Sequence, residues 1–193
     1  MHHIYHTEGI ILGSEDKGEA SKRYDIFTRE LGLVHARATG VRKLSSRLRF
    51  ILQDFACVKV DLVQGRNFWR VTSASKTSAL EFLAKDRAKL AIVFEIANLL
   101  KRLLPASEPN EKLFTDILCG FTILEKSGAE EDLRNLEVII VLRALHSLGY
   151  IGGGETLNHL IQSPLEADLV YQIGSARSLA LREINQALRA SHL

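Results

Sequence analysis

No long hydrophobic run occurs in this sequence. Its purely apolar stretches are short, as at Leu90–Phe94 and Val138–Leu142, and a charged residue follows each of them. A membrane-spanning helix needs about 20 apolar residues. The N-terminal segment Met1–His6 also lacks the basic and apolar regions of a signal peptide. We therefore expect no membrane association and a cytoplasmic location.

Cysteine is scarce, with two residues in the chain of 193. Cys57 and Cys119 cannot supply a four-thiolate zinc site, and two thiols in a chain that is not secreted are expected to be reduced and buried. His2, His3 and His6 have no carboxylate at a metal-ligand spacing, so we interpret them as part of a flexible N-terminal segment. We expect neither a metal ion nor a cofactor.

Catalytic motifs are lacking as well. The sequence contains no Gly-x-Ser-x-Gly, His-Glu-x-x-His or paired-carboxylate motif. Gly152–Gly154 is not followed by the Gly-Lys-Ser/Thr of a phosphate-binding loop, and we interpret it as a hinge. These absences favour a binding protein over an enzyme, and a metal-dependent nuclease is the least favoured reading.

Net charge is small, but it is unevenly distributed. The whole chain carries +2, whereas residues 1–80 hold 13 Lys and Arg against 8 Asp and Glu, and residues 81–193 hold 12 against 15. A basic half beside an acidic half indicates that one half meets a polyanion.

The first half shows the period-two alternation and the glycine-containing connections that are typical of strands and hairpins. Five segments have this pattern: Thr7–Gly13, Tyr24–Thr28, Leu33–Gly40, Phe55–Val63 and Phe68–Ser73. The connections between them include a polar turn at Ser14–Glu19, a hairpin turn at Arg29–Gly32 in which Gly32 can take a positive φ, and a turn at Gln64–Asn67.

A sheet of about five strands in some 75 residues must close or be covered to remove its edges. A five-stranded OB barrel is the economical solution, and an SH3-like barrel is the nearest rival. Residues Arg42–Gln53, between the third and fourth strands, fit the helix or long loop that an OB barrel commonly has there.

The second half shows helical periodicity. The predicted helices are Leu83–Leu104, stopped by Pro105; one capped by Asn110 that ends near Gly128; one capped by Asp132 that runs to Leu148; and Ala176–Leu188. We therefore predict an α+β multidomain protein, with an OB-fold barrel in residues 1–78 and an all-α helical domain in residues 79–193.

Short N-terminal pieces fall in an order that resembles the RecO family of bacterial recombination mediators. They are Thr7–Ile10, Gly18-Glu19, Phe27–Gly32, Ala38–Lys43, Ser46-Arg47, Leu52-Gln53 and Gly65-Arg66, joined in the second half by Leu148–Tyr150. The resemblance covers nearly all of residues 1–70 and is patchy afterwards.

This resemblance implies an OB domain followed by a helical domain. It also implies binding of single- and double-stranded DNA, annealing of complementary strands, and work with RecR so that RecA replaces single-strand-binding protein on DNA. A contact with the C-terminal tail of single-strand-binding protein is implied too, through the helical domain. The sequence is shorter than the usual member and lacks the four-cysteine zinc element that many members carry, so zinc is not expected.

The basic cluster of residues 17–49 is the main functional signal, with nine Lys and Arg against three Asp and Glu. Phosphate binding needs many cations along a track, because release of condensed counterions drives the affinity, and guanidinium groups bind phosphate with two hydrogen bonds. The candidate DNA-binding residues of this cluster are Lys22, Arg23, Arg29, Arg37, Arg42, Lys43, Arg47 and Arg49.

A predicted hairpin adds Arg66, Phe68 and Arg70 to the candidates. Basic residues interleaved with aromatic ones hold single strands on OB surfaces, because cations follow the phosphates while rings stack on bases. Alternation places Trp69 on one face of the strand and Phe68 with Arg70 on the other. We expect Phe68 on the DNA face and Trp69 in the core.

An adaptor that mainly binds proteins, with a barrel of little DNA affinity, is the alternative function. Its helical half would hold a short acidic, hydrophobic tail, with a Lys or Arg meeting the terminal carboxylate. Lys101, Arg102 and Arg143 are the candidates for that role.

Overall fold

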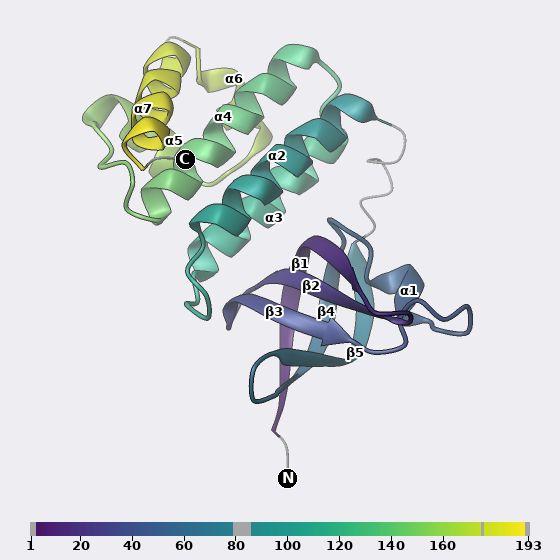
Figure 1. The fold of residues 1–193 in the computed structure, drawn as a ribbon. Coiled ribbons are helices and arrows are strands. Elements are labelled where there is room, and N and C mark those ends of the chain that lie inside the picture. The colour runs from purple at the N-terminus through teal and green to yellow at the C-terminus, as the bar shows by residue number, and fades with distance from the viewer. Residues whose placement is uncertain (1–2, 79–85, 175, 192–193) are drawn as a thin grey trace. The chain divides into compact units, whose positions relative to one another are not determined.

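Five strands form a closed barrel in the computed structural model, which describes residues 3–78, 86–174 and 176–191. The strands are β1 (Ile4–Lys17), β2 (Ser21–Thr28), β3 (Gly32–Ala38), β4 (Cys57–Gln64) and β5 (Trp69–Ser78). They follow the order β1-β2-β3-β5-β4, and β4 pairs back onto β1. All pairs are antiparallel except β3 with β5. The predicted OB fold is confirmed (Figure 1).

Alternation of side chains builds the core of the barrel. Tyr24 and Ile26 of β2 point inward with Val34 and Ala36 of β3, and all four are at most 1% exposed. Residues between them on the same strands face outward, as the sequence pattern predicts. The short helix α1 (Leu48–Ile51) lies in the predicted connection between β3 and β4 and contacts β5.

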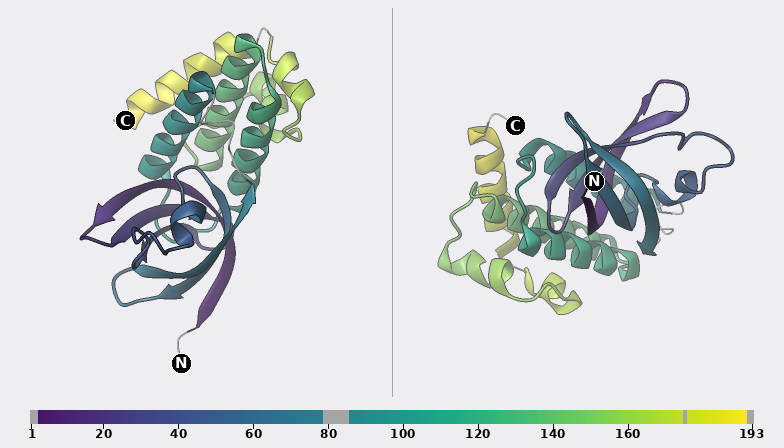
Figure 2. Two further views of the ribbon diagram at one scale, coloured as in Figure 1. Left: turned by 90° about the vertical axis from the view of Figure 1, so that its right-hand side faces the viewer. Right: turned by 90° about the horizontal axis from the view of Figure 1, so that it is seen from below.

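The β1–β2 hairpin is longer than predicted. Ser14–Lys17, expected to be a turn, continues β1 and pairs with the start of β2, so that Lys17 lies opposite Ser21. The turn is confined to three residues and Gly18 adopts the positive φ that it needs (+68°). The polar composition misled the prediction, because a hairpin with both faces in solvent needs no apolar alternation. Figure 2 shows it projecting from the barrel.

Histidine 6 also differs from its predicted place. His6 belongs to β1, opposite Asp61 of β4, and its Nδ1 lies 2.6 Å from Asp61 Oδ1. Strand pairing orders His6, so it is not part of a flexible segment. His3 precedes β1 and its ring lies 4.4 Å from that of Tyr5, centroid to centroid, whereas His2 lies outside the described residues. Cys57 is buried as expected, and desolvation raises the pKa of its thiol to about 11, while Cys119 is half-buried.

Contacts divide the chain into two compact units, residues 1–111 and residues 112–193. The first contains the barrel and α2 (Arg87–Leu103), which contacts β1. Asp86 caps α2 by accepting hydrogen bonds from the amides of Ala88 and Lys89. Residues 79–85 lie outside the described residues. The predicted domain boundary at 78/79 adjoins this segment, and the predicted helix Leu83–Leu104 begins within it.

The second unit is helical. Its elements are α3 (Glu111–Lys126), which starts on the last residue of the first unit, α4 (Glu130–Ser147), α5 (Glu155–Gln162), α6 (Ala167–Gln172) and α7 (Ala176–Ala190). The apolar helix α4 is central, as predicted, since α5, α6 and α7 all contact it (Figure 2). No helix of the described residues is both long and apolar enough to span a membrane.

A buried ion pair joins α3 and α4. The Arg143 guanidinium donates to Asp116 Oδ1 at 2.8 Å, to the Leu160 carbonyl at 2.8 Å and to the Ser163 carbonyl. The side chain of Arg143 is only 3% exposed. Arg143 is therefore not available to a partner's carboxylate. The sequence could not indicate this, because a single cation on an apolar helix has the same hydrophobic pattern whether it is buried or exposed.

Replacing Gly32 should destabilise the protein through a steric clash. Gly32 has a φ of +67°, and a Cβ there would lie 2.2 Å from the Glu108 carbonyl oxygen. Gly18 is the matched control, because its φ is +68° and nothing lies within 4 Å. We expect Gly18→Ala to cost about 1 kcal/mol for the left-handed backbone and Gly32→Ala about 1–3 kcal/mol more. Urea unfolding measures both; equal losses would contradict the clash.

Replacing Arg143 should leave a buried carboxylate without its cation. We expect Arg143→Met to lower the free energy of unfolding by about 3–5 kcal/mol. Adding Asp116→Leu to that variant should restore about 1–2 kcal/mol, because the uncompensated charge is removed. Denaturant titrations of the single and double variants test this, and a double variant no more stable than the single one would show that Asp116 is not the source of the loss.

Candidate nucleic-acid interface

Three arginines line up across the outer face of the barrel. Arg23 of β2 lies directly opposite Arg37 of β3, and Arg37 is in register with Arg70 of β5. Residues opposite each other on neighbouring strands are about 5 Å apart at Cα, and like charges so placed destabilise the sheet. We call Arg23, Arg37 and Arg70 the arginine row.

Counterions compensate only one end of the arginine row. Arg23 forms an ion pair with Glu15 of β1 at 3.1 Å. Arg37 donates to Ser21 Oγ at 3.5 Å, and its buried Nε has no hydrogen-bond partner among the described residues. Arg70 is exposed. No carboxylate of the described residues lies within ion-pair distance of Arg37 or Arg70, so this part of the row has unneutralised positive charge.

The β4–β5 loop (Gly65–Phe68) adds an aromatic ring to the same face. The Gly65 amide donates to the Phe68 carbonyl at 3.0 Å, and a Cβ at Gly65 would lie 2.6 Å from that oxygen. This tight closure leaves Phe68 44% exposed and Arg66 exposed. Trp69 instead packs on the barrel core and stacks edge-on against Tyr5 at 5.1 Å. Phe68 is thus exposed and Trp69 packs inward, as the alternation of side chains along the strand predicts.

A cavity of about 250 Å³ lies between this loop and β3, and we call it the loop pocket. Its polar and aromatic lining includes His35, Arg66, Asn67, Phe68 and Trp69. His35 Nδ1 lies 2.7 Å from Asp25 Oδ1 of β2. Because His35 is two residues from Arg37 on the same outward face of β3, the loop pocket continues the surface of the arginine row.

A second basic site lies at the end of the barrel. Its cavity of about 540 Å³, the barrel-end pocket, is lined by Asp16, Lys22, Tyr24, Val41, Arg42, Leu44, Arg49 and Leu52. Asp16 holds two cations, Arg42 at 3.2 Å and Lys22 at 3.9 Å. Burial raises the pKa of Tyr24 to about 12, helped by the carboxylates Asp54 and Asp16.

Lys43, Arg47 and Arg49 are all exposed in the connection that leads into and through α1. Leu44 and Phe50, in the same connection, are 85% and 63% exposed. The Arg49 guanidinium lies 5.7 Å from the centroid of the Phe50 ring. Sequence reasoning missed these two apolar side chains, although apolar residues within a basic, weakly helical loop were a signal that could have identified them.

Arg29 does not join either group. It lies in the β2–β3 turn, six residues along the chain from Arg23, and forms ion pairs with Glu8 at 2.9 Å and Glu111 at 3.4 Å. The hydrogen bond to Glu8 is the main reason that its pKa is raised. The structure thus places the other sequence-predicted residues in four groups: Arg23, Arg37 and Arg70 in the arginine row, Arg66 and Phe68 at the loop pocket, Lys22, Arg42 and Arg49 at the barrel-end pocket, and Lys43 and Arg47 exposed in the connection to α1.

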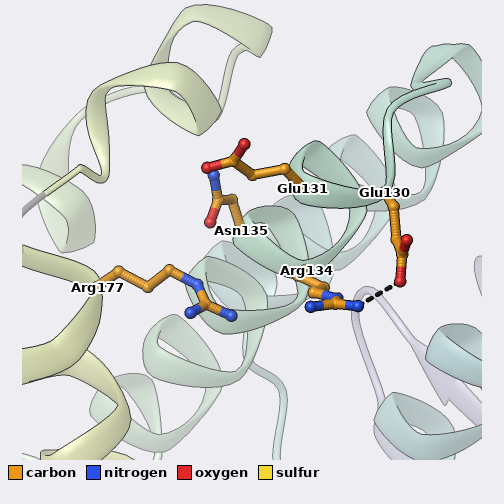
Figure 3. Close-up of a pocket in the computed structure, with 5 residues that line it drawn as sticks. All are labelled: Glu130, Glu131, Arg134, Asn135 and Arg177. Atoms are coloured by element: carbon orange, nitrogen blue, oxygen red, sulfur yellow. Dashed lines mark hydrogen bonds and ion pairs between the residues drawn. The ribbon is translucent and has the colours of Figure 1, made fainter.

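The helical unit has a pocket of mixed charge. Figure 3 shows the guanidinium groups of Arg134 and Arg177 extending from α4 and α7 beside Glu130, Glu131 and Asn135. Arg134 forms an ion pair with Glu130. Two acids offset two bases, so this pocket lacks the surplus of positive charge found on the barrel. No group of three or more potential metal ligands occurs in the part of the chain that the structure describes.

Comparison with known proteins agrees with this geometry. Residues 1–79 match the family model described as Recombination protein O N terminal. The chain is also similar to proteins named DNA repair protein RecO: 31% identical over 156 residues to that of Pelotomaculum thermopropionicum, 35% over 149 to that of Roseiflexus sp., and 33% over 147 to that of Heliobacterium modesticaldum.

These alignments cover 76–81% of this chain but 50–59% of the relatives. The chain therefore spans little more than half the length of the relatives it matches. The similarity begins with the OB barrel and extends well beyond it: residues 1–79 match the N-terminal domain of the RecO family, and the chain is similar to RecO proteins over most of its length.

Proposed function

We propose that the barrel binds DNA, with the arginine row on the phosphates of a strand and Phe68 stacked on a base. The observation that carries this proposal is the placement of Arg37, Arg70 and Phe68 on one outward surface, with no acidic partner for the two arginines in the described residues. The outer face of strands 2 and 3 and the loop between strands 4 and 5 are where OB folds hold oligonucleotides.

Both single- and double-stranded DNA are substrates in this proposal. Guanidinium groups bind the phosphates of either form, whereas Phe68 can stack only on a base that is not paired and stacked in a duplex. The arginine row therefore supplies affinity for both forms, and Phe68 adds affinity for single strands. Lys43 and Arg47 are also exposed, in the connection between β3 and β4, and add positive charge to the barrel.

Strand annealing and recombinase loading belong to the same proposal. Similarity to proteins named DNA repair protein RecO supports a role in DNA repair, and the family resemblance adds RecR, RecA and the C-terminal tail of single-strand-binding protein as partners. Arg143 is engaged by Asp116, so Lys101 and Arg102 remain as cations for that tail. This is a binding function and involves no covalent chemistry.

Removing two cations of the arginine row should weaken DNA binding in a salt-dependent manner. We expect Arg37→Ala/Arg70→Ala to reduce the slope of log affinity against log salt by about 1.4 on single strands, because each neutralised phosphate contributes about 0.7. Fluorescence anisotropy of a labelled oligonucleotide measures the slope. Lys59→Ala/Lys76→Ala is the matched control, since it removes two exposed cations from β4 and β5.

The result for the unmodified chain decides between the two functions. A chain that binds no oligonucleotide at low salt would overturn the proposal and favour the protein adaptor. If the slope of log affinity against log salt falls by the same amount in the control variant, DNA binding depends on the total positive charge of the barrel and not on the arginine row in particular.

Phe68→Ala should discriminate between single and double strands. Loss of base stacking should weaken single-strand binding by about 1–3 kcal/mol, roughly 5- to 150-fold, and leave the salt slope unchanged. Duplex binding should stay within about twofold, because the ring has no exposed base to stack on. Anisotropy with the same sequence in single- and double-stranded form tests this, and an equal loss on both forms would contradict base stacking.

A further inference from the structure

The two basic sites lie on opposite faces of the β1–β2 hairpin. In this hairpin Glu15 is opposite Arg23, and the next pair is Asp16 opposite Lys22. Successive residues of a strand point to opposite sides. The arginine row therefore extends from the Arg23 side, while Asp16 and Lys22 line the barrel-end pocket on the other side.

The barrel-end pocket is suited to an anion. Lys22, Arg42 and Arg49 line it against a single carboxylate, Asp16. Hydrogen bonds fix the first two cations in place: Lys22 Nζ donates to Ser14 Oγ at 3.2 Å and Arg42 donates to the Gly18 carbonyl at 3.0 Å. Arg49 has no carboxylate partner in the described part of the chain. The site is thus ordered and keeps a surplus of positive charge.

Apolar groups beside the same pocket are suited to bases. Leu44 lines the pocket and is 85% exposed, and Phe50 is 63% exposed two residues before Leu52, another lining residue. Lys43 and Arg47 are exposed on the same connection. An exposed ring among cations is the arrangement that holds a single strand, with phosphates on the cations and bases on the ring.

We propose that the barrel-end pocket is a second nucleic-acid site, so that one chain holds two single strands, one on each face of the β1–β2 hairpin. This inference rests on the proposed function, because it divides the DNA-binding residues into two separate sites. The strand in the barrel-end pocket places a phosphate among Lys22, Arg42 and Arg49, and a base on Phe50.

The number of short oligonucleotides bound per chain tests this inference. An oligonucleotide of about six nucleotides lies within the range of about 4–16 that one OB fold holds and is too short to occupy both faces. Sedimentation velocity with a fluorescent oligothymidylate, run at saturating concentration and with the mass of the complex determined, gives the ratio directly. We expect two oligonucleotides per chain.

Three variants that each remove two cations assign the sites, and a fourth is the control. Arg42→Ala/Arg49→Ala should bind one oligonucleotide. One chain of this variant should therefore no longer hold two different oligonucleotides at once. Arg37→Ala/Arg70→Ala should also bind one, and Arg66→Ala/Arg70→Ala, in which both residues are exposed, provides the same test without a half-buried position. Lys59→Ala/Lys76→Ala should still bind two. Circular dichroism melting confirms that each variant is folded.

The outcomes separate the two proposals. One oligonucleotide on the unmodified chain, weakened equally by the row and pocket variants, would show a single continuous track and overturn the second site while leaving DNA binding intact. Two oligonucleotides retained by Arg42→Ala/Arg49→Ala would place the second site elsewhere and overturn the assignment. No binding at all would overturn the proposed function and this inference with it.

Discussion

Closure of the barrel depends on a short parallel pairing between β3 and β5. Only Ala36 with Trp69 and Arg37 with Arg70 are in register there, yet this contact removes the last open edges of the sheet. It also fixes the direction of two side chains at once. Trp69, opposite Ala36, packs inward on the core, and Arg70 points outward in register with Arg37. The register of β3 with β5 therefore determines both which side chains enter the core and which cations form the arginine row.

Concentrating cations on one sheet face has an energetic cost. Two unit charges about 5 Å apart in water repel by about 1 kcal/mol, and salt screens this repulsion only in part at that distance. The barrel offsets the cost with a core in which Tyr24, Ile26, Phe27 and Leu62 are almost completely buried, each contributing roughly 1.5–3 kcal/mol. A closed apolar core can thus support a surface that would destabilise a smaller sheet.

The sequence was informative wherever one face of a strand is buried. Val34, Ala36 and Ala38 alternate with outward residues because a one-residue slip would expose the whole set, so the strands, the exposed Phe68 and the inward Trp69 could all be predicted. The same rule fails for Ser14–Lys17, where both faces of the hairpin meet solvent. Positive φ at Gly32 was predictable from its turn, because few other residues adopt that conformation.

Ion pairing could not be predicted, because it depends on residues that are distant in sequence. Arg29 is a basic residue of the same cluster as Arg37, but Glu8 and Glu111 reach it through the fold. Arg143 differs from Lys101 and Arg102 because its side chain is buried, and the ion pair with Asp116 compensates its charge there. Composition identifies how many cations a segment has, whereas only the fold determines which of them are already neutralised.

The hairpin carboxylates show how a binding surface can be ordered before its ligand arrives. Glu15 holds Arg23 on one face, and Asp16 holds Lys22 and Arg42 on the other. Each acid fixes cations by side-chain contacts in solvent, where an ion pair contributes at most about 1 kcal/mol, so a phosphate can displace or share them at little cost. The neighbouring Arg37 and Arg49 are left without an acid in the described residues. One carboxylate on each face thus orders part of a cationic surface and leaves the remainder free for phosphate.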